Sequence, residues 1–221
     1  VPIVGYFQID TLNTGARRDI PKDDMAGMLG TWAGIVAYLG SFMIIGATID
    51  AVTRERALGV TAWIITKPVS RLSYLSAKAI GHMVVGVVTV VVAPAILWLL
   101  LTVVLFRGVL IGNVFAAVLI LCVEVAFLSF VNVALGVVFR SVTPILIFSL
   151  GLWFVPTIIP SIQSLDWTVY VLPAYLPVAA IVAAYDPSEE KRFVLLISLV
   201  SLGISACVFW LSAVIFERQE L

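Results

Sequence analysis

Charged residues are scarce in this sequence. Asp, Glu, Lys and Arg make up 12% of its 221 residues, against about 25% in soluble domains. Hydrophobic residues make up 62%, and several apolar runs exceed the roughly 18 residues that mark a candidate transmembrane helix. A soluble core does not require uninterrupted apolar runs of that length. The sequence therefore predicts an all-α polytopic membrane protein in a lipid bilayer.

Several chemical features are missing as well. The net charge is zero, which gives no bulk electrostatic case for binding nucleic acid. The two cysteines, Cys122 and Cys207, lie in apolar runs and indicate neither a disulfide framework nor a metal site. The sequence has no GxxxxGK(S/T) loop for nucleotide phosphates and no paired-Asp, Ser-His or HExxH arrangement for hydrolysis. We therefore expect no catalytic residue, no cofactor-binding residue and no enzyme activity on this chain.

Five apolar stretches are predicted to cross the bilayer. The second contains Pro94, so we expect a tilt or a kink there. Residues 161–192 contain Pro173, Pro177 and several Trp and Tyr residues, which favours an interfacial or partly re-entrant hairpin over a sixth span. The five predicted spans are residues 31–49, 79–106, 113–138, 144–160 and 193–216.

Basic residues set the predicted orientation. The segment after the first span is rich in Lys and Arg, whereas the next loop holds only Arg107. By the positive-inside rule, residues 51–71 are cytoplasmic. Residues 1–30, which do not form a signal peptide, and 161–192 are then extracytoplasmic, and the C-terminus is cytoplasmic. Five spans with an external start imply one more span before Val1, in a multi-pass plasma or inner membrane protein.

The cytoplasmic segment has its own local pattern. Residues 53–66 have helical spacing with Thr53 as a plausible N-cap, and the residue before Pro68 is pushed out of the helical region. Ser70 is expected to cap the following helix, and Trp63 suits the headgroup boundary. On physical grounds alone, this segment is either an ordinary basic cytoplasmic loop or a helix that docks onto a partner protein, and both interpretations remain open.

Between Arg54 and Lys78 the sequence resembles the permease subunits of ABC-2 type exporters, also called type-2 ABC exporters. The matching residues are Glu55-Arg56, Gly59, Pro68-Val69-Ser70-Arg71 and Lys78, followed much later by the terminal "FERQEL".

The resemblance implies six helices, pairing as a homodimer or heterodimer, and docking of the first cytoplasmic loop, the coupling helix, onto an ABC ATP-binding subunit. ATP and Mg²⁺ would then belong to that partner. The implied docking residues are Arg54, Glu55, Arg56, Gly59, Trp63, Pro68, Ser70 and Arg71.

Glu124 is the one acidic residue deep in a predicted span. An intramembrane carboxylate costs about 2.5–3.5 kcal/mol on insertion scales and usually faces a bundle interior or a wet cavity. Glu124 and Asn132 form a possible substrate path, or they are hydrogen-bonded packing residues. His82 is expected to be structural.

The leading functional hypothesis is the membrane-spanning permease of an ATP-driven exporter. A secondary transporter would need an ion relay, yet only Glu124 and His82 titrate within the apolar runs, and no internal repeat is found. A non-transporting scaffold subunit of a membrane complex is the remaining alternative.

Overall fold

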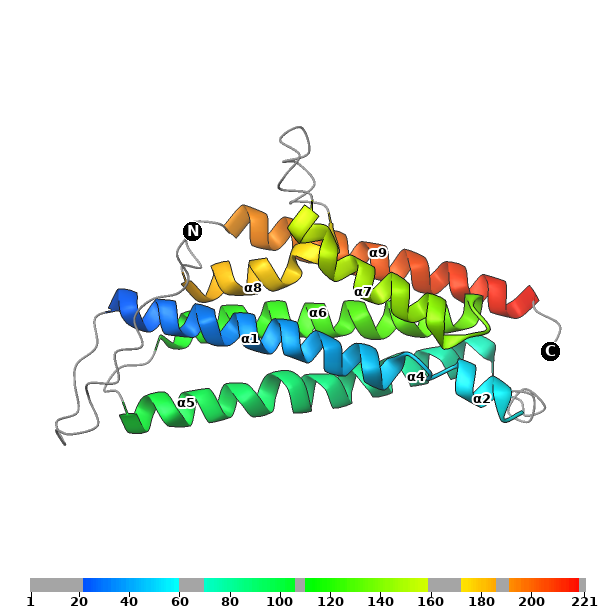
Figure 1. The fold of residues 1–221 in the computed structure, drawn as a ribbon, viewed down its shortest axis with the longest axis horizontal. Helices are drawn as coiled ribbons and strands as arrows, with labels where there is room; N and C mark the ends of the chain where they lie inside the picture. Colours follow the sequence, from blue (N-terminus) through cyan, green and yellow to red (C-terminus); the bar gives the residue numbers. More distant parts are fainter. Residues whose placement is uncertain (1–21, 60–69, 106–109, 159–171, 186–190, 219–221) are drawn as a thin grey trace.

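The computed structural model describes residues 22–59, 70–105, 110–158, 172–185 and 191–218. Within these ranges the chain is helical and has no strand, which confirms the predicted all-α polytopic class. The long helices lie roughly side by side in an elongated bundle (Figure 1). Its elements are α1 (Lys22–Thr48), α2 (Thr53–Ala57), α4 (Arg71–Gly86), η1 (Val87–Val92), α5 (Ala93–Leu105), α6 (Ile111–Val138), α7 (Val142–Ile158), η4 (Pro173–Tyr175), α8 (Leu176–Tyr185) and α9 (Lys191–Arg218).

Four helical segments in the described ranges are long and apolar enough to cross a membrane. Their outward-facing side chains are apolar, as at Leu39, Leu100 and Leu199, which are 61%, 58% and 67% exposed. Water would disfavour such surfaces, whereas lipid does not, so the bundle is built for a bilayer. The four segments are Lys22–Ala57, Arg71–Val104, Ile111–Val138 and Arg192–Arg218.

The first helix begins at Lys22, earlier than the predicted start of the span at residue 31. Asp23 and Asp24 occupy its first turn, where negative charge is favourable near the helix N-terminus. Met25 and Leu29 are already buried. A hydropathy boundary marks where the hydrocarbon layer begins, but the helix itself extends further because its small and apolar residues pack in the bundle.

The second span is a continuous but irregular helix. Between α4 and α5 lies the π-helical segment η1 (Val87–Val92), directly before Ala93 and Pro94. Proline lacks an N–H and its ring crowds the carbonyl four residues earlier, here that of Val90. A π-helical turn is one way a helix accommodates such a break. The disturbance expected from Pro94 therefore takes this form.

Helix α6 is the centre of the bundle, with α1, α4, α7, α8 and α9 packed around it. Its buried residues lie along its whole length, from Val114 to Val137. Two glycines allow neighbouring helices to come close. Gly40 of α1 packs against Val90, and Gly86 of α4 packs against Ile44 of α1 and Val125 of α6. Helices α6 and α9 contain the predicted spans 113–138 and 193–216.

Helix α7 has 17 residues, about 25 Å of helix. The end of the predicted 144–160 span, the fourth of the five, lies outside the described residues, so this crossing stays a prediction. In Figure 1, α7 lies beside the C-terminal half of α6 and α8 beside the N-terminal half.

Helix α8 has only 10 residues, about 15 Å, and it lies inside the bundle. Ala179 and Ala180 are fully buried where α8 packs against α1, α6 and α9. Asn113 of α6 donates to the carbonyl oxygens of Ala184 and Tyr185 at 3.0 and 3.1 Å, satisfying the end of α8. The interfacial or partly re-entrant hairpin predicted for this segment stays a prediction, to which the structure adds that α8 is packed among the long helices. Tyr175, which was expected at the membrane boundary, is buried.

The bundle has two distinct ends (Figure 1). At one end, α2 meets the start of α4 and the C-terminal ends of α6 and α9; we call this the α2 end. At the other end, the start of α6 lies near the end of α8; we call this the α8 end. The predicted docking residues that the structure describes all belong to the α2 end.

Candidate functional site

Helix α2 is shorter than the sequence predicted. It begins at Thr53 and ends at Ala57, where a helix to residue 66 was expected. Leu58 leaves the helical region and Gly59 adopts φ = +70°, a left-handed conformation that glycine reaches without a steric penalty. Residues 60–69, including Trp63 and Pro68, lie outside the described ranges, so the predictions for them are not addressed.

The two predicted capping residues have different outcomes. Thr53 is not an N-cap, because the residue before it, Val52, is already helical (φ −103°, ψ −41°) and the chain enters α2 directly from the turn after α1. Ser70 does cap α4: its backbone is extended (φ −66°, ψ 145°) and its side chain accepts a 3.0 Å hydrogen bond from Ser73 N. That prediction is confirmed.

Glu55 faces the interior of the α2 end. Its carboxylate forms an ion pair with Lys78 and accepts a hydrogen bond from the Tyr74 hydroxyl, both on α4. The ammonium of Lys78 also lies 5.5 Å from the centroid of the Tyr74 ring. The Lys78 side chain is 13% exposed and that of Glu55 is 32% exposed, so water screens this contact only in part. These groups fasten α2 to α4.

Arg56 and Arg71 hold the ends of two further helices. Arg56 Nη1 donates to the Val137 carbonyl of α6 at 2.9 Å. Arg71 Nη1 donates to the carbonyls of Phe216 and Glu217 of α9 at 2.5 and 3.0 Å. Carbonyls in the last turn of a helix lack partners within it, and positive charge there is favourable. Arginine therefore suits both positions.

Both guanidinium groups also lie over the ring of Phe216, at 5.4 Å for Arg56 and 5.7 Å for Arg71. Phe216 is fully buried, so its ring attracts these cations in a partly desolvated setting. We call Glu55, Arg56, Arg71, Lys78 and Phe216 the α2-end cluster. It connects α2, α4, α6 and α9.

Arg54 points away from this cluster. Its side chain is 74% exposed and pairs with Asp50 only at 3.9 Å, an interaction of little energetic weight at a surface. The neighbouring Leu58 is 68% exposed. Sequence reasoning treated Arg54, Glu55 and Arg56 alike; the structure shows that α2 has an inner face and an outer face. Leu58, which follows this helix, is not among the predicted docking residues.

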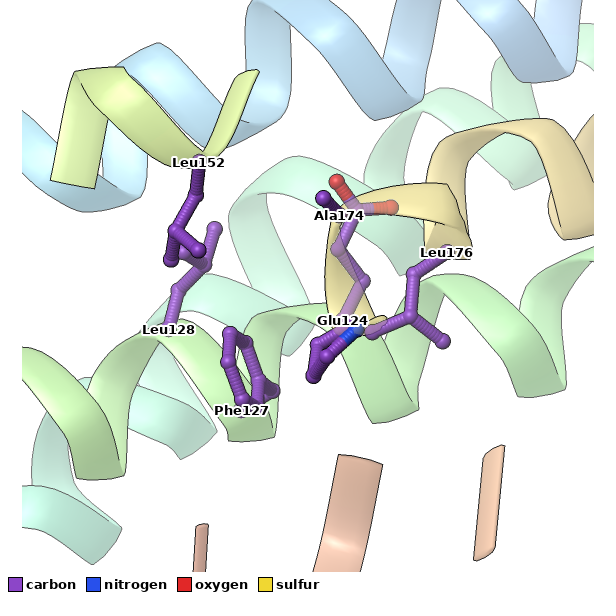
Figure 2. Close-up of a pocket in the computed structure, with 7 residues that line it drawn as sticks. Glu124, Phe127, Leu128, Leu152, Ala174 and Leu176 are labelled. Carbon is purple, nitrogen blue, oxygen red and sulfur yellow. The ribbon is translucent and has the colours of Figure 1, made fainter. Parts of the chain in front are cut away.

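The second group of predicted residues lies in the interior. Glu124 of α6 is 3% exposed, and its Oε1 is in hydrogen-bond contact with the Ser41 hydroxyl of α1. Its Oε2 has no hydrogen-bond partner among the described residues. Figure 2 shows the side chain reaching from α6 toward the turn that carries Ala174, at the wall of a small cavity.

Asn132 has a different environment. Its Nδ2 donates to Thr48 Oγ1 of α1 at 2.8 Å, and its Oδ1 accepts from Ser149 Oγ of α7 at 2.6 Å. Asn132 thus joins three helices, with both ends of its amide engaged. This arrangement is what the packing interpretation of Asn132 expects.

Within the described ranges, no group of three or more His, Cys, Asp or Glu side chains could hold a metal ion. The arrangement is a helical bundle with a polar cluster at one end and a buried carboxylate midway.

The geometry therefore defines a multi-pass helical membrane protein. The family model for the ABC-2 family transporter protein matches residues 2–221. The chain belongs to this family and is its membrane transport component, a permease. No curated protein matches it.

Proposed function

We propose that this chain is the membrane-spanning permease subunit of an ATP-driven ABC exporter, and that its partner ATPase docks on the 51–71 loop. The observation that supports docking is the two-faced α2. Its inner face is bound to α4, α6 and α9 through the α2-end cluster, while Arg54 and Leu58 face outward. An exposed cation beside an exposed apolar side chain is a suitable start for a protein contact.

The partner would carry ATP and Mg²⁺, because this sequence has no phosphate-binding loop. Movement of the docked subunit would act on the outer face of α2. The Glu55–Lys78 ion pair would pass it to α4, and the Arg56 contact with Val137 would pass it to α6. Because Arg56 and Arg71 both contact the ring of Phe216, the movement would also reach α9.

The proposal includes an assembly and an orientation. The α2 end and the C-terminus lie in the cytoplasm, and the membrane is a plasma or inner membrane. A second permease copy or a homologue completes the transporter. The basic residues of the 51–71 loop support this orientation.

The test is affinity purification in mild detergent followed by mass spectrometry, for the native chain and an Arg54→Glu/Leu58→Glu variant. Both positions are exposed, so the substitutions should leave the bundle intact. A P-loop ATPase should copurify with the native chain and be lost from the variant. The matched control is Arg192→Glu, an exposed charge reversal at the start of α9.

Retention of the ATPase by the double variant would refute docking on the outer face of α2. Recovery of another membrane subunit, with no ATPase, would favour the scaffold hypothesis instead.

A further inference from the structure

Helix α7 contributes no residue to the α2-end cluster. It begins shortly after the end of α6 and packs mainly against α6 and η4. Leu146, Ile147 and Phe148, near its middle, are all exposed, so much of its described surface faces away from the bundle. A movement at the α2 end therefore has to reach α7 through contacts outside the cluster.

Asn132 of α6 supplies such a contact. Ser149 Oγ of α7 donates to Asn132 Oδ1 at 2.6 Å, and Asn132 Nδ2 donates to Thr48 Oγ1 of α1 at 2.8 Å. Thr48 Oγ1 donates in turn to the carbonyl oxygen of Ile44 at 2.7 Å. A hydroxyl has a single proton to donate, and both hydroxyls spend it in the same direction. The result is one chain of hydrogen bonds that runs from α7 through α6 to α1.

This chain is shielded from water. Thr48, Asn132 and Ser149 are all buried, and a buried polar group that loses its partner is costly. In such surroundings hydrogen bonds are stronger than in water, and neighbouring bonds polarise one another. Asn132 therefore holds Thr48 and Ser149 in fixed relative positions, although the two hydroxyls contact Asn132 rather than each other.

Thr48 lies next to the α2 end. It is the last residue of α1, and the turn that follows leads directly into α2. The N–H of Ala51 donates to the Thr48 carbonyl at 3.1 Å. Val52 packs against α6, where a Cβ added at Gly136 would lie 3.0 Å from the Val52 Cβ. The end of α1, the turn and the start of α2 are thus closely connected, and a force on α2 acts on Thr48 over a short distance.

Farther along α7, the helix meets the segment that carries α8. Leu152 of α7 lines a small cavity together with Ala174 of η4 and Leu176 of α8 (Figure 2), and α7 packs against η4. In alternating access a transporter changes conformation on both sides of its substrate site. Helix α7 offers a path from the α2 end to α8 for such a change.

We propose that Asn132 is a positioning residue of the permease, which makes α7 follow the movement of the α2 end and so carries it toward η4 and α8. The inference rests on the function proposed above, in which the docked ATPase drives that movement. Asn132 acts through Ser149 and Thr48. Coupling between distant sites needs direct evidence, and removal of the Thr48 hydroxyl, on a different helix, provides it.

The first test measures the distance between α7 and α9 with two spin labels, in nanodiscs and without ATPase. One label is placed on α7 after Ile147→Cys, and the other on the native Cys207 of α9; both positions are exposed. Cys122→Ala removes the other cysteine. The labelled chain is diluted with unlabelled chain, so that the measured distances arise within one copy.

Thr48→Val is the informative variant, because it removes the hydroxyl on α1 and leaves Asn132, Ser149 and the whole of α7 unchanged. Thr31→Val is the matched control. Thr31 also lies on α1, but its exposed hydroxyl donates to the Gly27 carbonyl of its own helix at 3.0 Å. Ser149→Ala removes the other end of the link.

Thr48→Val should shift or broaden the distance between α7 and α9 by about 2 Å, the size of helix shifts in switching proteins. Ser149→Ala should have the same effect, and the double variant should add nothing to it, because residues that act as one network are not additive. Thr31→Val should match the native chain. A native distance in Thr48→Val would overturn the proposal, and a change in Ser149→Ala alone would reduce Asn132 to a local packing residue.

The second test uses the complex with the copurified ATPase, before and after trapping with ATP and vanadate. In the native chain the distance between α7 and α9 should change on trapping, and in Thr48→Val it should not. A second label pair, on Cys207 and after Leu39→Cys on the outward face of α1, should report a change in both chains. An equal change at α7 in both chains would overturn the role of Asn132. No change at α1 in the native chain would instead refute the ATPase-driven movement, whatever the first test shows about the link.

Discussion

Arg71 of α4 donates a hydrogen bond of 2.5 Å to the carbonyl oxygen of Phe216 in α9 and lies over the ring of the same residue at 5.7 Å. One side chain thus makes a polar and an aromatic contact with a helix far along the sequence. The start of the second span and the end of the last span are thereby fixed to each other at the α2 end.

Arg71→Ala should destabilise the chain by about 1.5–3 kcal/mol, the range for hydrogen bonds to charged groups. Arg71→Lys should recover only part of this, because an ammonium lacks the planar guanidinium group that lies over the Phe216 ring while it donates to both carbonyls. Thermal unfolding in detergent measures both. Arg54→Ala is the control and should change little, since Arg54 is exposed; an equal loss there would contradict the role given to Arg71.

The ion pair between Glu55 and Lys78 should behave as a coupled unit. A double-mutant cycle with Glu55→Gln and Lys78→Met is expected to give a coupling free energy of about 0.5–3 kcal/mol, as for residues in direct contact. Because the pair lies on the inner face of α2 and Lys78 is only 13% exposed, its coupling free energy should exceed the typical value for an exposed pair. Unfolding free energies of the two single variants and the double variant supply the value. Strictly additive effects would mean that α2 is not fastened to α4 by this pair.

Gly86→Ala should destabilise the bundle. A Cβ at this position would lie 2.9 Å from Val125 Cγ1 and would also run into Ile44, an overpacking that typically costs about 1–3 kcal/mol. Gly81→Ala, in the same helix, has no atom within 4 Å of the added Cβ. It should be neutral or stabilising by up to about 1 kcal/mol, because alanine is the better helix former. Unfolding midpoints compare the two, and a reversed order would refute the close packing of α1, α4 and α6.

Asn132→Leu should reduce stability by removing the bridge between Thr48 and Ser149. Hydrogen bonds between membrane helices average about 0.6 kcal/mol each in double-mutant cycles, so the loss of both should cost about 1–2 kcal/mol. The measurement is unfolding of the detergent-purified chain. Ser149→Ala removes one of the two bonds and should give the smaller loss; no loss in either variant would show that this bridge contributes nothing.

The sequence predicted the parts of this fold that depend on local chemistry. Ser70 caps α4 because a serine directly before a helix can accept a hydrogen bond from the backbone N–H three residues later. This contact is local and does not depend on the surrounding structure. The long apolar stretches became helices because the bilayer leaves the backbone few alternatives. The irregularity before Pro94 follows from the missing N–H of proline in the same way.

Two features that the sequence did not predict depend on contacts with residues far away in the chain. In a helix as short as α2, no periodicity tells the inner Glu55 and Arg56 from the outer Arg54; that choice follows from Tyr74, Lys78, Val137 and Phe216. The burial of α8 was missed for a related reason. The prolines and tyrosines of η4 and α8 are typical of a membrane boundary, whereas the alanines of α8 let it lie against α1 and α6.

The wide turn of η1 has a consequence for the two halves of the second span. A π-helical insertion adds a residue to the spiral, and each residue of an α-helix advances the direction of its side chains by about 100°. Helix α4 packs against α6 and exposes Val84 and Val85 near its end, and beyond η1 helix α5 exposes Leu97 and Leu100. Any rotation of α4 reaches α5 through the six residues of η1, whose hydrogen bonding differs from that of a regular α-helix. The two halves of the second span can therefore rotate or bend relative to each other at η1.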